Sequence, residues 1–184
     1  MKTIATNNMK KRISQDRLYE YLTAHNVKLT RLAELMGKSQ PVVSSCFIHH
    51  KDSNGRARCF SVENIRLLNH ALPLLAEELR DCRMTFGSAR TFRNSWGFTY
   101  DPALVEPMKR VAFYLNIYPL TKRLLDWSKS KCKNTITSST CPVYGNIMEA
   151  DVESINAELL SIADKLEVIE VIPDKDAYDG PGRN

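Results

Sequence analysis

Residues 29–43 read LTRLAELMGKSQPVV, and this stretch decides the expected fold. Its first half carries apolar residues at the three-and-four spacing of one buried helix face: Leu29, Leu32, Ala33 and Met36. Gly37 follows at once, and glycine is the residue best suited to the left-handed position that ends a helix. Ser39 can then cap a further helix with Pro41 in its first turn, where a missing N–H costs little. The stretch therefore predicts two short helices joined by a tight turn.

Helices are also expected on either side of this pair. Ser14 can cap a first helix that runs to a stop at Asn26. Ser61 can cap a long fourth helix that ends near Cys82, and Pro73 inside it predicts a kink or a break into two helices. The helix that Ser39 caps is the third, and its inner face is expected to hold Val42, Val43, Cys46 and Phe47.

The residue types along the second and third helices fit a helix-turn-helix unit. A small Ala33 lets the two helices approach closely, Gly37 makes the turn, and Val43 reaches back into the core. On these residues, and on the start of the fourth helix at 61–65, the stretch 15–79 resembles the Cro/phage-repressor (XRE-type) helix-turn-helix family. The resemblance implies a lambda-repressor-like, all-α bundle. It also implies sequence-specific binding of double-stranded DNA by a transcriptional regulator of the phage-repressor type.

The third helix and the loop after it carry the candidate DNA contacts. The exposed face of the helix is expected to offer Lys38, Ser39, Gln40, Ser44 and Ser45. The resemblance places Gln40 and Ser45 where the family reads bases, and glutamine can bond bidentately to adenine. Phosphate contacts are expected from Lys28, Arg31 and Lys38, and in the loop from Lys51, Arg56 and Arg58. Each of these is ordinary as a solvated side chain, so the cluster carries the prediction.

The C-terminal half carries an echo of the first half. Residues 151–155 (DVESI) repeat the pattern of residues 61–65 (SVENI) at a spacing of 90 (151 − 61). Apolar spacing predicts further helices over about 101–115, 120–125 and 128–136, which would be the first three helices of a second copy. The third of these would bring lysines to the DNA backbone, with an asparagine beside them: Lys129, Lys131, Lys133 and Asn134. The alternative is an unrelated helical domain for dimerisation or effector response.

The expected organisation is a duplicated all-α fold. It consists of a helix-turn-helix domain over 13–83, a connector over 84–100, a second helical domain over 101–173 that is a candidate degenerate helix-turn-helix, and a disordered tail over 174–184. The stretch before the first domain is also expected to be disordered. Five aromatic residues in the connector predict a β-hairpin or an irregular strap. We expect the first domain to keep its fold when the chain is cut after Thr85.

Charge and composition narrow the function classes. Residues 1–60 hold 11 Lys and Arg against 4 Asp and Glu, a net +7, whereas residues 142–184 hold 3 against 10, a net −7. The net positive charge of residues 1–60 favours a surface that binds a polyanion such as DNA. No apolar run approaches the ~18–20 residues that span a bilayer, so a membrane partner is not expected. Five cysteines without a CxxC pair predict reduced thiols and a cytoplasmic location.

No catalytic motif or phosphate-cradling glycine-rich loop stands in the sequence, so we expect no enzyme, no cofactor and no small-molecule substrate. A zinc site is disfavoured because structural zinc uses closely paired ligands, unlike the set Cys46, His49, His50 and Cys59. Two function classes stay open. One is a sequence-specific DNA-binding regulator, with homodimer formation left open. The other is a helical protein–protein interaction module, such as an adaptor or an antitoxin-like partner, without DNA binding.

Overall fold

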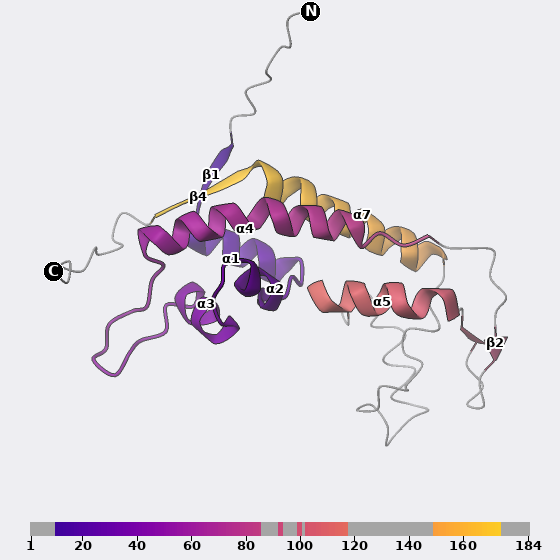
Figure 1. The fold of residues 1–184 in the computed structure, drawn as a ribbon, viewed down its shortest axis with the longest axis horizontal. Coiled ribbons are helices and arrows are strands. Elements are labelled where there is room, and N and C mark those ends of the chain that lie inside the picture. Colours follow the sequence, from indigo (N-terminus) through magenta and orange to yellow (C-terminus); the bar gives the residue numbers. More distant parts are fainter. Residues whose placement is uncertain (1–9, 86–91, 94–98, 101, 118–148, 174–184) are drawn as a thin grey trace, which may run out of the picture.

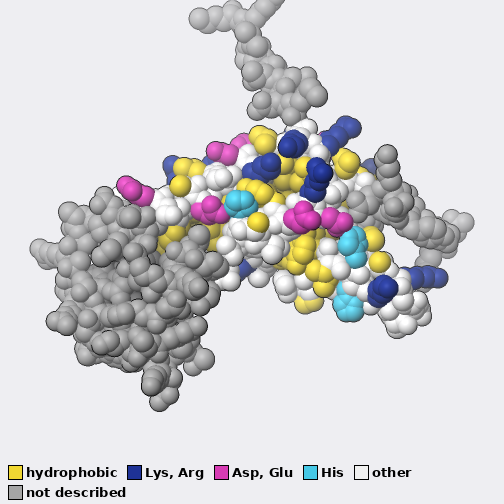
Figure 2. All heavy atoms as spheres, turned by 180° about the vertical axis from the view of Figure 1, so that it is seen from behind, with side chains coloured by type: hydrophobic (Ala, Val, Ile, Leu, Met, Phe, Trp, Pro, Cys, Tyr) yellow, Lys and Arg dark blue, Asp and Glu magenta, His cyan; other side chains and the backbone are white. Residues whose placement is uncertain are grey.

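The computed structural model describes residues 10–85, 92–93, 99–100, 102–117 and 149–173. Figure 1 shows how the elements are arranged, and Figure 2 shows the side chains from behind. The helices are α1 (Gln15–Ala24), α2 (Leu29–Leu35), α3 (Gln40–Phe47), α4 (Val62–Asp81), α5 (Pro102–Tyr114) and α7 (Glu149–Val168). The strands are β1 (Lys11–Ser14), β2 (Phe92–Arg93), β3 (Thr99–Tyr100) and β4 (Ile169–Ile172). The described part of the chain is mostly helical, as predicted, and none of its helices is long and apolar enough to cross a membrane.

The predicted caps begin α1 and α4. The Ser14 hydroxyl accepts a hydrogen bond from the Arg17 N–H at 3.3 Å, and the Ser61 hydroxyl accepts one from the Asn64 N–H at 3.2 Å. Each bond satisfies a backbone donor that has no partner inside the helix. α4 continues unbroken past Pro73, so the chain does not split into two helices there.

Three helices end in the same left-handed turn. α1, α2 and α3 are each followed by a residue with positive φ, namely Asn26 (58°), Gly37 (65°) and His49 (50°). After α2, the Gly37 N–H donates to the Glu34 carbonyl and the Lys38 N–H to the Ala33 carbonyl, both at 2.9 Å. This pairing is the Schellman motif, which turns the chain sharply at a helix end. Asn26 and Gly37 are thus confirmed as the predicted stops.

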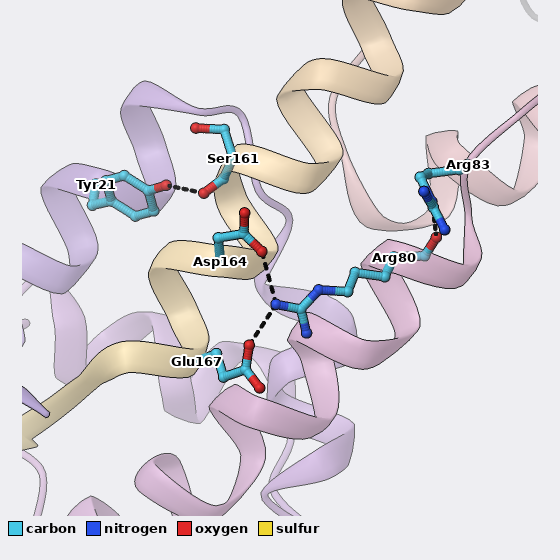
Figure 3. A network of polar contacts seen from close by, with 6 residues as sticks. All are labelled: Tyr21, Arg80, Arg83, Ser161, Asp164 and Glu167. Atoms are coloured by element: carbon cyan, nitrogen blue, oxygen red, sulfur yellow. Dashed lines mark hydrogen bonds and ion pairs between the residues drawn. The ribbon is translucent and has the colours of Figure 1, made fainter. Parts of the chain in front are cut away.

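α4 and α7 are the longest helices, and they pack antiparallel over each other (Figure 1). Their facing sides are fully buried and apolar, with Leu68, Leu72, Leu75 and Leu79 on α4 and Ile155, Leu159, Ile162 and Leu166 on α7. Polar contacts border this seam (Figure 3). Arg80 donates to Asp164 at 2.8 Å and also to Glu167, and the Tyr21 hydroxyl of α1 donates to the Ser161 carbonyl at 3.4 Å. α7 is therefore fixed to both α1 and α4.

This packing joins the two predicted domains in one hydrophobic core, which contains residues from α1 to α5 and from α7. Removing everything after Thr85 would expose the apolar side of α4 to water. The shared core therefore argues against the expectation that the stretch 13–83 keeps its fold alone.

Two asparagines tie α4 and α7 together in the same way. Asn69, the eighth residue of α4, donates to the Val171 carbonyl and accepts from the Val171 N–H, both at 2.8 Å. Asn156, the eighth residue of α7, makes the same two bonds to Met84, at 2.7 and 2.8 Å. Both helices have 20 residues, and the clamps repeat at a spacing of 87 (156 − 69 and 171 − 84). An approximate two-fold axis therefore relates the two helices and their clamps.

The structural spacing of 87 corrects the spacing of 90 expected from the sequence echo. At 87, Ile65 corresponds to Val152, and these residues are 4% and 2% exposed. At 90, Val62 would correspond to Val152, but Val62 is 41% exposed. A slip of three residues leaves apolar positions on the same side of a helix, because neighbours on one face lie three and four residues apart. The sequence similarity therefore aligned the two helices about one helical turn out of register.

A small parallel sheet corrects the all-α prediction. β1 pairs with β4 in a register that runs from Lys11 opposite Ile169 to Ser14 opposite Ile172. Lys11 and Arg12, which belong to the stretch expected to be disordered, are thus part of a strand, and the chain directly after α7 is a strand as well. Each strand has four residues, too few for a period of two to stand out in the sequence.

The remaining elements belong to the connector and to the second half. β2 and β3 pair antiparallel, which agrees with the hairpin alternative for the connector. α5 confirms the helix expected over 101–115, and α7 includes the helix expected at the end of the second half. The segment after α5 docks on the turn between α1 and α2, where the Asn116 N–H donates to the Asn26 carbonyl at 2.7 Å. The helices expected over 120–125 and 128–136 lie outside the described residues.

Candidate nucleic-acid interface

α3 has one buried side and one side open to solvent. Val43, Cys46 and Phe47 are 0%, 6% and 2% exposed and contribute to the core. The predicted DNA-facing residues lie together at the start and along the outer side of the helix, with Lys38, Ser39 and Gln40 exposed and Ser44 and Ser45 half-buried. The turn before α3 therefore leaves the N-terminal end of α3 and the Lys38 ammonium open to solvent.

Two residues of α3 differ from the expectation. The Ser45 hydroxyl donates to the Pro41 carbonyl one turn earlier, at 2.6 Å, so only its oxygen lone pairs remain for another partner. Val42 was expected on the inner side but is 43% exposed. Successive helical residues are turned by about 100°, so a helix that buries Val43 turns Val42 outward. The exposed valine adds an apolar surface of the kind that contacts a thymine methyl group.

Asp52 orders the loop between α3 and α4. Its carboxylate accepts the backbone N–H groups of Asn54 and Arg56, both at 2.9 Å, and the bond from Arg56 lowers the pKa of Asp52. Lys51 and Ala57 pair across the loop in an antiparallel bridge. The resulting turn exposes all three loop residues predicted to contact phosphate, which are Lys51, Arg56 and Arg58.

Aromatic packing fixes the end of this loop to α3. Phe60 is 2% exposed and meets Phe47 edge-on, with ring centroids 4.8 Å apart. Phe47 in turn stacks on Tyr19 of α1 at 5.3 Å. Such aromatic pairs stabilise by about 0.5–1.5 kcal/mol beyond their buried area. The loop is therefore anchored at both ends beside α3, and Figure 2 shows Lys and Arg side chains at this end of the molecule.

The cations of this surface are not neutralised within the described structure. In the ranges that the structure describes, no ion pair involves Lys38, Lys51, Arg56 or Arg58. Four positive charges thus lie just before α3 and in the loop after it, and the Asp52 carboxylate is close enough to Arg56 and Arg58 for their charges to lower its pKa further. Charges arranged in this way attract a polyanion and bind its phosphates.

Arg31 and Lys28 do not join this surface, contrary to the expectation. Arg31 forms a bidentate pair with Glu78 of α4, at 2.8 and 2.7 Å, and a third bond to Glu34 at 2.9 Å. The bonds to Glu78 raise the pKa of Arg31 and lower that of Glu78. The Lys28 ammonium donates to the Ala112 carbonyl of α5. Both cations therefore hold helices together. Arg31 is neutralised by two carboxylates, whereas Lys28 keeps its charge but is directed toward α5.

The predicted contacts of the second half, Lys129, Lys131, Lys133 and Asn134, lie outside the described residues. Within the described ranges, no group of His, Cys, Asp and Glu side chains has the arrangement of a metal site. Comparison of the chain with protein-family models, curated proteins and solved structures gives no significant match. The candidate interface therefore rests on the geometry of α3 and its loop.

Proposed function

We propose that the chain binds double-stranded DNA sequence-specifically through α3 and the loop that follows it, as a transcriptional regulator of the helix-turn-helix type. One observation carries the proposal: a short helix, set off by a tight turn, exposes a polar side near four cations that form no ion pair with any described residue. A structural surface helix needs no such group of like charges, since like charges repel one another. DNA supplies the phosphates that make the arrangement favourable.

Each side chain of the interface has an expected role in this proposal. Gln40 reads a base, and adenine is the base that its amide matches bidentately. Val42 contacts the methyl group of a thymine. Lys38, Lys51 and Arg56 bind phosphates, and so position α3 without reading sequence.

The reciprocal asparagine clamps support a second part of the proposal, that the C-terminal half is a second copy of the same unit. A two-fold axis between two copies would let one chain do what helix-turn-helix proteins do as dimers. Their recognition helices enter successive major grooves about 34 Å apart on a pseudo-palindromic site. We therefore expect the full chain to cover two half-sites.

Fluorescence anisotropy with the full-length chain and duplexes selected from a random pool tests the proposal. Gln40→Ala should reduce discrimination at one base pair by about 1–3 kcal/mol. Lys51→Gln and Arg56→Gln should weaken all sequences alike and each lower the salt slope by about 1. Arg83→Gln is the matched control, because Arg83 is exposed and follows the C-terminal end of α4, whereas the loop precedes its N-terminal end.

Absence of binding at low salt would contradict DNA binding and favour the helical interaction module. If Gln40→Ala discriminates between base pairs as well as the parent chain does, the base-reading role of α3 is contradicted, but DNA binding itself is not. A footprint of one half-site, about ten base pairs, would contradict only the second copy.

A further inference from the structure

Three titratable side chains form a chain at the surface, where the start of α1 meets the loop after α3. His49 Nε2 lies 2.7 Å from Asp16 Oδ1, and His49 Nδ1 lies 3.5 Å from Cys59 Sγ. The imidazole is thus placed between a carboxylate and a thiol. Cys59 is exposed, so a reagent in solution can reach its sulfur. Nucleophile, base and orienting carboxylate in this order are the parts of an activated nucleophile.

The backbone of His49 adds to this argument. His49 occupies the left-handed position after α3, with φ 50°, where α2 has Gly37 and α1 has Asn26. Histidine, like asparagine, is one of the non-glycine residues found more often in this conformation. The turn therefore fixes the backbone of His49 and, with it, the place from which its side chain reaches Asp16 and Cys59.

Asp16 sets which nitrogen of His49 carries the hydrogen. An ionised carboxylate can only accept, so Nε2 carries the hydrogen and the Nδ1 lone pair faces the thiol. The buried amide of Gln15 lies 3.3 Å from the same Nε2 and supports the ring from the core side. Its oxygen and nitrogen exchange places by a half-turn, so it can accept from that N–H as well.

We propose that Cys59 is a reactive thiol that exchanges with small, negatively charged disulfides. The Cys59 proton passes to His49 Nδ1 as Sγ attacks one sulfur of the reagent. A new S–S bond forms, the S–S bond of the reagent breaks, and the departing thiolate takes up the proton. Cys59 is thereby oxidised to a mixed disulfide, and the other half of the reagent is reduced to a thiol. This exchange does not depend on DNA binding.

The charges around the thiol favour an anionic reagent. Asp16 of α1 is engaged with His49. Cys46 of α3 lies near Cys59 but is buried, and Arg58 is the adjacent loop residue, with no ion pair in the described ranges. Asp52 of the same loop lies close enough to Arg58 to be affected by its charge, but its carboxylate is held by two backbone N–H groups. The guanidinium is therefore the charge available to a reagent that approaches Sγ.

Thiol exchange with the anionic aromatic disulfide DTNB tests the proposal on the full-length chain. We expect Cys59 to react fastest at pH 7, with the site identified by the mass of the labelled peptide. His49→Asn removes the base and keeps a residue that tolerates the left-handed turn. Because a free thiol is only a few per cent ionised at pH 7, this variant should react about tenfold more slowly at Cys59. His50→Asn is the matched control, since His50 bonds to the Lys51 carbonyl and not to the thiol.

A second pH separates activation from access. At about pH 10 a free thiol is ionised without a base, so the parent chain and His49→Asn should then react at similar rates. Equal rates at pH 7 would overturn the proposal, and so would a deficit that persists at pH 10. Asp16→Asn keeps the base and should slow the reaction several-fold at pH 7 only. Arg58→Gln should slow DTNB but not the neutral 2,2′-dithiodipyridine, and equal slowing of both would overturn the preference for anionic reagents.

Discussion

The two asparagine clamps should each stabilise the folded chain by about 2–3 kcal/mol. Each clamp makes two half-buried hydrogen bonds of 2.7–2.8 Å to the N–H and C=O groups of one backbone residue, Val171 for Asn69 and Met84 for Asn156. A net hydrogen bond contributes about 1 kcal/mol, and a buried backbone group without a partner costs about 1–3 kcal/mol. Asn69→Ala and Asn156→Ala each remove two bonds and leave two backbone groups partly exposed to water, which gives the stated range.

Urea unfolding at pH 7, followed by the helical circular dichroism signal, measures these losses. The two variants should lose similar amounts of unfolding free energy, because the two-fold axis makes the clamps equivalent. The double variant should lose about the sum, because the clamps lie at opposite ends of the α4–α7 pair. Ser154→Ala, at an exposed position of α7, is the control and should change the unfolding free energy by less than about 0.5 kcal/mol.

Asn69→Asp gives a sharper form of the same test. An ionised carboxylate still accepts the Val171 N–H, but it places an oxygen instead of an N–H against the Val171 carbonyl. Protonation of the introduced carboxyl restores a donor, so folding should raise its pKa. The unfolding free energy that Asn69→Asp loses relative to the parent chain should therefore become smaller as pH falls from 7 to 4. The clamps do not contribute as expected if the stability loss of Asn69→Asp is independent of pH, or if either alanine variant loses less than about 0.5 kcal/mol of unfolding free energy.

Three further predictions concern single groups. Glu78→Gln should lose about 1–2 kcal/mol at pH 7, and urea titrations should show this loss shrinking below about pH 4. Arg31 lowers the pKa of Glu78, so the stability that this pair contributes is present above the unfolded pKa and is lost as pH falls through the folded one. Gly37→Ala should cost about 1 kcal/mol in urea unfolding from left-handed strain alone, since an added Cβ meets no atom within 4 Å. Burial raises the pKa of the Cys46 and Cys82 thiols, so mass spectrometry should find them labelled by maleimide only after unfolding.

The features that sequence predicted correctly are those that neighbouring residues determine. A serine hydroxyl at Ser14 or Ser61 reaches an N–H three residues ahead, and Gly37 adopts its positive φ without strain. The apolar spacing of α2 and α3 selects their buried sides within one or two turns. Helix ends and the turn between α2 and α3 were therefore predictable from a short stretch.

The features that sequence missed depend on partners far along the chain. Arg31 looked like a free cation because its partner, Glu78, follows 47 residues later (78 − 31). β1 was not predicted because its pairing strand follows α7, and a four-residue strand carries little pattern of its own. The Asn69 clamp has no local signal, since a helical asparagine is usually solvated. Only the folded arrangement gives these residues their roles.

Residues 142–184 are acidic and from their net charge alone would repel DNA, but three of their carboxylates pair with cations of the N-terminal half. Asp164 and Glu167 of α7 pair with Arg80 of α4, and Glu170 of β4 lies 3.5 Å from Arg12 of β1. Figure 1 shows α7 and α3 on opposite sides of α4. These carboxylates therefore neutralise cations on the far side of the fold, and in the described ranges they form no ion pair with the cations near α3. The net charge of a half of the chain thus says less about DNA binding than the side of the fold on which each charge lies.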